Sequence, residues 1–118
     1  MSNQYPYARF QNLLVASRKE AADAEFEGCD EILSFIAEAS DAGKVVRITE
    51  LVQYIAFGTG PTVHRKCNLL AARGFLNVEV SDADKRAKTL TLTKKAHRFL
   101  ADRSNLMHQI IKKIDPII

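Results

Sequence analysis

Residues 57–75 read FGTGPTVHRKCNLLAARGF, and this stretch decides the fold. Gly58, Gly60 and Pro61 stand directly before a basic helical pattern that ends at another glycine, Gly74. Glycine adopts backbone angles that β-branched residues resist, and proline suits the first turn of a helix, where its missing N–H would have had no partner. We therefore predict two short helices that meet across a tight corner, with the second helix ending at the last glycine.

The predicted helix after the corner has two different faces. A helix turns by about 100° per residue, so residues three, four and seven positions apart share a side. The inner side carries Val63, Cys67, Leu70 and Gly74. The outer side carries Pro61, Arg65, Asn68 and Ala72. This outer side is predicted to face away from the core.

Two strands and a charged loop follow this helix. LNVEV at 76–80 and KTLTLT at 88–93 both alternate with the period of two that is typical of strands. The loop SDADKRA joins them and carries Lys85 and Arg86 at its tip. The pattern predicts a β-hairpin with a charged tip.

A long helix is predicted at the end of the chain. Its sequence, KKAHRFLADRSNLMHQIIKKI at 94–114, follows Thr93 as a cap and ends before Asp115-Pro116. Its apolar stripe, which Arg103 interrupts, consists of Phe99, Leu100, Leu106, Met107, Ile110, Ile111 and Ile114. The stripe exceeds what the surface of one small domain normally carries, so it predicts a partner helix.

Two amphipathic helices are predicted before residue 42. The first, YARFQNLLVASRKEAA, places on one stripe Phe10, Leu13, Leu14 and Ala21. The second, DEILSFIAEASDAG, gathers Ile32, Leu33, Phe35, Ile36 and Ala39. Gly43 is predicted to close the second helix as a left-handed cap.

A short strand and a third helix are predicted between residues 45 and 57. VVRI at 45–48 is rich in β-branched residues, and Thr49 is placed to accept the first free N–H groups of a helix beginning at Glu50. The expected inner face of this helix is Leu51, Val52, Ile55 and Ala56.

Composition is that of one compact domain, which we expect to span 1–118. The chain has 118 residues, of which 47% are hydrophobic and 26% charged. It contains neither a secretion signal pattern nor 18 consecutive apolar residues, so a cytoplasmic protein is expected. The net charge of +3 is unevenly divided: residues 1–43 carry three basic and eight acidic residues, and 44–118 carry fourteen and six. This asymmetry favours a polyanion-binding face, although a solvated surface also produces it.

The order helix, helix, strand, helix, corner, helix, hairpin, helix is that of a winged helix-turn-helix, and the chain resembles a MarR-type winged-helix transcriptional regulator. The resemblance covers roughly residues 30–114. It rests on TVHRKCNLLAARGFL at 62–76 and on DKRAKTLTLTKKA at 84–96. It implies a mainly α structure with a small β-hairpin wing, an α+β fold with a winged-helix core at 30–93. Segments 1–27 and 94–118 would then supply dimerisation helices.

The expected DNA contacts follow from the two motifs. An α-helix fits the major groove, where Arg65 can contact guanine and Asn68 adenine, with Thr62 and His64 beside them. Thr59 and Pro61 lie where this helix begins, so the Thr hydroxyl and backbone N–H groups there can hold a phosphate. The resemblance implies that the wing arginine, Arg86, enters the minor groove and that Asp84 orients it. Further phosphate contacts are expected from Lys66, Lys85, Lys88, Lys94 and Lys95.

A homodimer is expected, with double-stranded DNA as its partner. The first and last helices would pair across a two-fold axis and place two recognition helices about 34 Å apart on DNA. The residues expected at this interface are Phe10, Leu13, Leu14, Leu106, Met107, Ile110, Ile111 and Ile114. No effector is predicted from the sequence.

Two other roles are compatible with the same patterns. The alternatives are a winged-helix module that docks a protein and a DNA-binding protein of plasmid or phage maintenance, with Arg65 and Asn68 as ordinary solvated residues in the first. No catalytic motif is found, and His64, His97 and His108 lack metal-ligand spacing, so we expect no enzyme, metal or cofactor. Cys67 and Cys29 are both expected to be thiols. Cys67 is expected to be buried and unreactive; Cys29 lies near a helix start that would favour thiolate, but no resolving cysteine is nearby in the sequence.

Overall fold

The computed structural model describes residues 5–17, 28–80, 83 and 87–114. The chain forms two compact units. One consists of Met1–Ala24 with Ala101–Ile118, and the other of Glu25–Leu100. Within the described residues, no helix is both long enough and apolar enough to span a bilayer.

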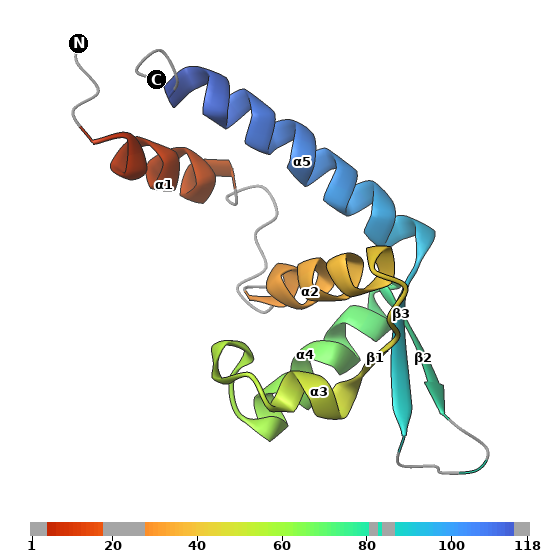
Figure 1. Ribbon diagram of the computed structural model, residues 1–118. Coiled ribbons are helices and arrows are strands. Elements are labelled where there is room, and N and C mark those ends of the chain that lie inside the picture. Colours follow the sequence, from red (N-terminus) through yellow and green to blue (C-terminus); the bar gives the residue numbers. More distant parts are fainter. Residues whose placement is uncertain (1–4, 18–27, 81–82, 84–86, 115–118) are drawn as a thin grey trace. The chain divides into compact units, whose positions relative to one another are not determined.

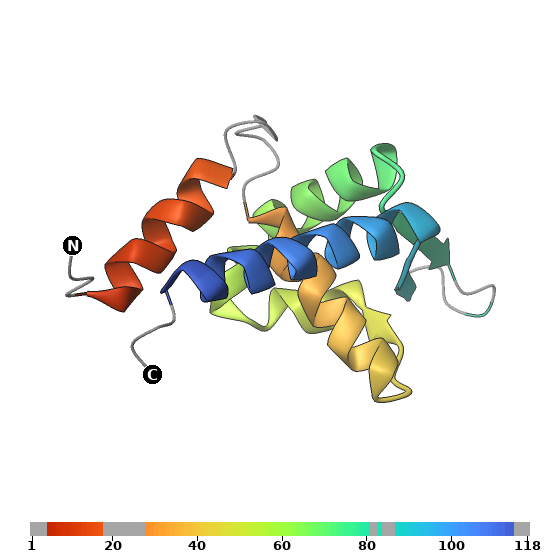
Figure 2. The ribbon, with the colours of Figure 1, turned by 90° about the horizontal axis from the view of Figure 1, so that it is seen from above.

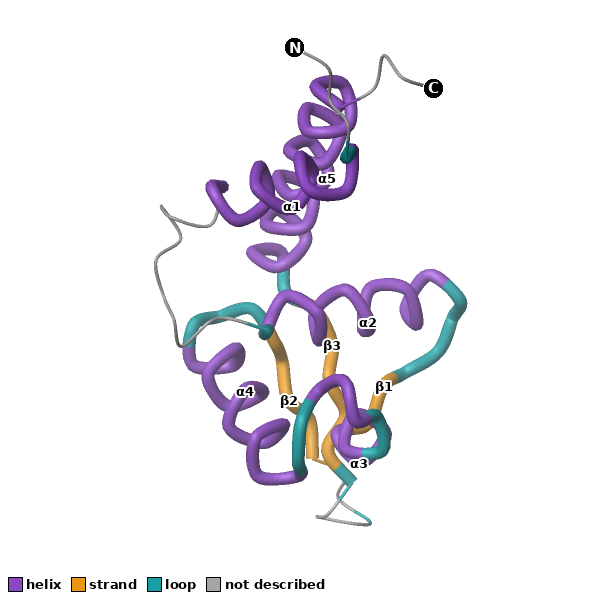
Figure 3. The backbone as a smooth tube through the Cα atoms, turned by 90° about the vertical axis from the view of Figure 1, so that its left-hand side faces the viewer, coloured by secondary structure: helices purple, strands orange, loops and turns teal. Residues whose placement is uncertain are grey.

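The larger unit packs helices against one side of a small sheet (Figures 1 and 3). Its elements are α2 (Cys29–Asp41), β1 (Val46–Arg47), α3 (Ile48–Val52), the 3₁₀ turn η2 (Ile55–Phe57), α4 (Gly60–Ala72), β2 (Leu76–Val80), β3 (Lys88–Leu92) and the start of α5 (Lys94–Ile114). The strands are antiparallel in the order β1-β3-β2, and Leu90 pairs with Val46 on one side and Val78 on the other. The predicted fold class, mainly α with a small β-hairpin wing, is confirmed.

One apolar core lies between the helices and the sheet of this unit. Its largest fully buried side chains are Ile32, Leu33, Val46, Leu51, Val63, Leu70 and Leu90. They come from α2, β1, α3, α4 and β3, so the burial of apolar area joins α4 to the sheet.

The two helix ends predicted at glycines are confirmed. Gly43 follows α2 with φ 76°, and the N–H groups of Gly43 and Lys44 donate to carbonyls of Ser40 and Ala39 at 2.9 and 2.8 Å. Gly74 follows α4 with φ 81° in the same arrangement. A residue with φ in this left-handed region is usually glycine, since a Cβ is strained there.

The start of the last helix is also confirmed. The Thr93 hydroxyl accepts a hydrogen bond from the N–H of Ala96 at 3.2 Å, as an N-cap does. The same hydroxyl donates to the carbonyl of Gly74 at 2.6 Å. Thr93 therefore caps α5 and joins it to the end of α4.

The predicted start of the third helix is wrong by two residues. α3 begins at Ile48 instead of Glu50, so its N-cap is Arg47 and Thr49 lies inside the helix. The N–H of Arg47 donates to a Glu50 carboxylate oxygen at 3.4 Å. This carboxylate, three residues after the cap, accepts the N–H of the cap residue itself, as in one half of a capping box.

The predicted inner face of that helix is wrong beyond Leu51. α3 ends at Val52, whose side chain is exposed. Two residues later, Tyr54 has an extended backbone with φ −96° and ψ 114°. The helical period stops there, so Ala56 is exposed and Ile55 is 94% exposed. Phe57 is buried in their place. The physical cause is an aromatic cluster, in which the Tyr54 ring lies 5.1 Å from that of Phe35 and 5.9 Å from that of Phe57.

The smaller unit contains α1 (Pro6–Ser17) and the part of α5 from Ala101 onward, which lie beside each other (Figure 2). Ala21, which the sequence places on the first helix, lies outside the described residues. Arg103 donates to the hydroxyl of Ser17 at 3.5 Å. Leu106, Met107 and Ile110 line one pocket with Phe10 and Leu14, so this part of the apolar stripe meets α1 within one chain, and Ile110 is only 3% exposed.

Candidate nucleic-acid interface

The two faces of α4 lie as the sequence predicts. Val63, Cys67 and Leu70 are buried in the core, and Gly74 lies beyond the end of the helix. On the outer side the exposed residues are Pro61, His64, Arg65, Asn68 and Ala72. Thr62 is partly exposed. The helix therefore presents an arginine and an asparagine to solvent at positions three residues apart.

The corner before α4 is shaped by one glycine. Gly58 has φ 105°, and its N–H donates to the carbonyl of Ile55 at 3.0 Å. A Cβ at this position would stand 2.9 Å from Cγ2 of Thr62. Gly60 does not share this role, contrary to our prediction, because its φ is not positive and it is the first residue of α4.

The first turn of α4 gathers hydroxyl and N–H groups on the exposed side. Thr59 is the N-cap, its hydroxyl donates to that of Thr62 at 3.1 Å, and its carbonyl accepts from the N–H of Val63 at 2.9 Å. The N–H groups of the residues before Val63 have no carbonyl acceptor within the helix, and Pro61 has no N–H. A helix N-terminus of this kind is electrostatically favourable for an anion.

Two of the lysines that the sequence predicts as phosphate contacts form hydrogen bonds within the protein, and their predicted role stays a prediction. Nζ of Lys66 donates to the carbonyl of Phe57 at 3.4 Å. Nζ of Lys95 donates to the carbonyl of Arg73 at 2.7 Å and lies 4.6 Å from the centre of the Phe75 ring. Lys88 and Lys94 are exposed.

The wing is described up to its loop. β2 and β3 pair over their full lengths, with Glu79 opposite Thr89 and Val80 opposite Lys88. Asp84, Lys85 and Arg86 lie outside the described residues. Their predicted roles stay predictions.

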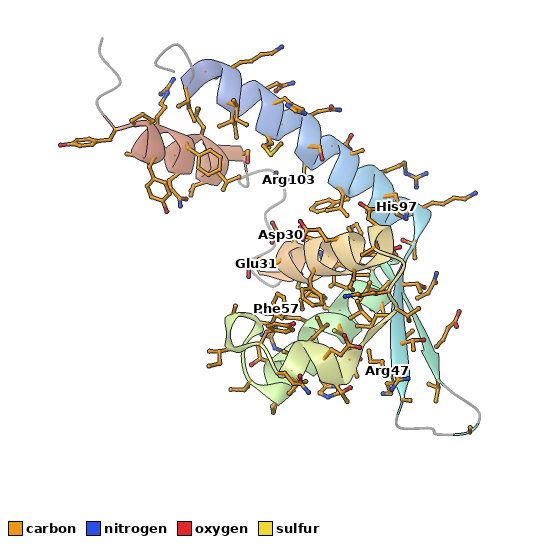
Figure 4. The ribbon with its side chains drawn as sticks, viewed as in Figure 1. Asp30, Glu31, Arg47, Phe57, His97 and Arg103 are labelled. Carbon is orange, nitrogen blue, oxygen red and sulfur yellow. The ribbon has the colours of Figure 1, made fainter. Side chains whose placement is uncertain are left out.

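Arg47 is a basic residue near the wing that the sequence analysis did not select. It is exposed on β1 and is paired with Thr89, next to Lys88, and Figure 4 shows it beside the strands of the hairpin. A strand of only two residues is too short to show an alternation of buried and exposed positions. Only the basic charge of Arg47 could have suggested this residue.

Both cysteine side chains are buried. Burial raises the pKa of Cys29, and the positive charges of Lys66 and Arg65 offset part of the rise. Burial, followed by the nearby Cys29, raises the pKa of Cys67 from 9.0 to about 11. The interpretation of both residues as thiols agrees with these directions, since for Cys29 desolvation outweighs the nearby positive charges.

Thiol reactivity provides a first prediction. At pH 8 we expect iodoacetamide to alkylate Cys67 about a hundredfold more slowly in the folded protein than in urea, because a pKa higher by two units leaves that much less thiolate. The titration of Cys67 leaves the free energy of unfolding unchanged below about pH 9 and lowers it as the pH rises from 9 toward 11, because the thiol ionises more readily in the unfolded chain. Equal alkylation rates with and without urea would contradict the buried position.

The expected dimerisation residues divide by exposure in the smaller unit. Phe10, Leu13, Leu14, Leu106 and Ile114 are partly exposed, Ile110 is buried, and Met107 and Ile111 are each 44% exposed. A pocket of about 220 Å³ lies in this unit. Its lining residues are Phe10, Leu14, Arg103, Leu106, Met107 and Ile110.

The described residues contain no group of three His, Cys, Asp or Glu side chains placed to hold a metal ion.

Comparison with known proteins links this geometry to solved structures. No family model and no curated protein matches the chain. The fold matches PefR, a heme sensor protein from Streptococcus agalactiae, with a TM-score of 0.67 and 17% identity over 97% of this chain and 80% of that one. It also matches BpsR from Bordetella bronchiseptica, whose DNA binding is regulated by 6-hydroxynicotinic acid, with a TM-score of 0.60 and 19% identity over 95% and 77%.

A further match is a mutant form of MepR from S. aureus that is bound to an oligodeoxyribonucleotide. Its TM-score is 0.58 and its identity is 16%, over 95% of this chain and 80% of that one. These neighbours are winged-helix regulators of the MarR family. The chain therefore has the winged helix-turn-helix fold of MarR-type regulators, which confirms at the level of the fold the resemblance drawn from residues 62–76 and 84–96.

Proposed function

We propose that the protein is a homodimeric, cytoplasmic regulator of transcription that binds double-stranded DNA at a specific sequence. The observation that carries this proposal is the division of α4: one side is buried in the core, and the other presents Arg65 and Asn68 to solvent directly after a helix N-terminus. A rigid helix with this face fits the major groove, and its two side chains match guanine and adenine edges.

The proposed complex uses the wing as a second contact. The hairpin loop with Lys85 and Arg86 would enter the minor groove, where negative potential is concentrated, with Asp84 orienting the arginine. Lys88 and Arg47, both exposed beside the hairpin, would contact phosphates. Thr59 and the N–H groups at the start of α4 would hold another phosphate. The structure of MepR with an oligodeoxyribonucleotide supports DNA as the partner of this fold.

The regulatory mechanism we propose is occupancy of a promoter, which would exclude polymerase. No cofactor or metal is proposed. Two of the matched structures are proteins described with a small molecule: PefR with heme, and BpsR with 6-hydroxynicotinic acid.

The Arg65→Ala variant tests base recognition. DNA fragments that the wild-type protein selects from a random pool would define the site, and mobility shifts would measure affinity. We expect the variant to lose about 1–3 kcal/mol on the selected site and to relax the preference at one base pair, since a bidentate contact to guanine is lost.

Arg98→Ala is the matched control, because it removes the same charge from an exposed position on another helix, α5. It should leave the base preference unchanged. An equal loss of affinity by Arg65→Ala on all sequences would make that residue a phosphate contact instead of a base reader.

A second candidate function, docking of a protein, is favoured by one observation. Ile55 is 94% exposed and lies beside the half-exposed Tyr54, so the corner carries apolar surface. Exposed apolar patches often mark interaction sites. The absence of DNA binding by the wild-type protein at low salt would favour this function over regulation.

A further inference from the structure

Lys66 extends from α4 to two other elements of the larger unit. Its Nζ donates a hydrogen bond to the carbonyl of Phe57, the last residue of η2, at 3.4 Å. The same group lies against Gly28, directly before α2. A Cβ built on Gly28 would stand 2.9 Å from Nζ and 3.6 Å from Cε of Lys66. The lysine is only partly exposed, whereas the preceding Arg65 is exposed.

The surroundings of this ammonium group agree with an inward role. Gly28 has φ 83° and no side chain, so it leaves the space that the lysine occupies. The charge of Lys66 lowers the pKa of buried Cys29, the first residue of α2, against the effect of burial, which places the cation close to that thiol. Phe57 also packs against α2, since its ring centre lies 5.6 Å from that of Phe35.

Resting on the proposed DNA-binding function, we infer that Lys66 is a positioning residue: it joins α4 to the corner and to the start of α2, and it does not contact a DNA phosphate. Phe57 directly precedes Gly58, where the chain turns into α4, so a bond to its carbonyl acts at the turn that aims the helix. A charged donor makes a stronger hydrogen bond than a neutral one. Small changes in the direction of a recognition helix alter every base contact together.

The Lys66→Met variant tests this inference through the salt dependence of binding. Methionine keeps an unbranched apolar stem and removes the donor and charge. We expect affinity for the selected DNA to fall about fivefold to tenfold, with an unchanged slope of log K against log salt and unchanged non-specific binding. Binding would be measured at a temperature at which circular dichroism shows the variant to be fully folded. Lys66→Arg, which keeps a donor, should recover most of the affinity.

Lys88→Met is the matched control, because that lysine is exposed on β3 and is a proposed phosphate contact. The slope of log K against log salt should become shallower for this variant by about 0.9, the value for one phosphate. The same fall for Lys66→Met would overturn the inference. Unchanged affinity of the folded Lys66→Met protein would overturn it as well, because a residue that aims the helix cannot be removed without effect.

Hydrogen exchange without DNA separates this inference from the proposed function. The N–H groups of Gly58 and Val63, which donate to Ile55 and Thr59, should exchange faster in Lys66→Met, while those of β3 stay protected. Unchanged exchange at the corner would contradict the bond to Phe57. If the wild-type protein fails to bind DNA, the proposed function falls, and exchange still decides whether Lys66 holds the corner.

Discussion

Leu51→Ala is expected to lower the free energy of unfolding by about 2–5 kcal/mol, whereas Ile55→Ala changes it by no more than about 0.5 kcal/mol. The two residues are four positions apart, and a continuous helix would bury both. Leu51 is 0% exposed in the core of the larger unit, so its truncation removes buried methyl groups and leaves a cavity. Ile55 is 94% exposed and has little contact to lose.

Urea unfolding at one fixed protein concentration measures both variants, since dimerisation makes stability depend on concentration. Each substitution removes a branched four-carbon side chain down to one carbon, so the pair is matched in chemistry. A large loss for Ile55→Ala would show that α3 continues past Val52 and that the extended residue Tyr54 is wrongly placed.

Replacing Met107 and Ile111 together with glutamate is expected to convert the proposed dimer into a monomer of 13.2 kDa. Both side chains are 44% exposed in the smaller unit and so have apolar surface left for a partner. Around a two-fold axis the substitution would place four carboxylates in one apolar seam. We expect the dissociation constant of the dimer to rise about a hundredfold or more, measured by sedimentation or light scattering.

Asn105→Glu with Gln109→Glu is the control for the dimer prediction. These two exposed residues add the same charge to the same stretch of α5, on its other side. This pair should leave the mass unchanged. Ile110 is 3% exposed within one chain, so a charge there would disturb the packing of α1 as well. An unchanged mass for the Met107 and Ile111 variant would place the interface elsewhere.

The candidate nucleic-acid interface is predicted in part by the sequence alone. The division of α4 into Val63, Cys67 and Leu70 inside and Arg65 and Asn68 outside follows from a helical period that runs without interruption between a proline and a glycine. The residues that escaped prediction are those whose side chains reach across elements. Lys66 and Lys95 look like surface charges in the sequence, yet their ammonium groups bond carbonyls of Phe57 and Arg73.

Local signals were strong enough to place α4, β2, β3, α5 and the glycine ends of α2 and α4, because periodicity, proline and glycine act over a few residues wherever the chain goes. They also indicated the winged helix-turn-helix order. The break after Val52, the exposure of Ile55 and the inward course of Lys66 depended on packing instead. Rings of Phe35, Tyr54 and Phe57 meet only once α2 and the corner are folded together, and non-local burial of this kind overrides a helical pattern of eight residues.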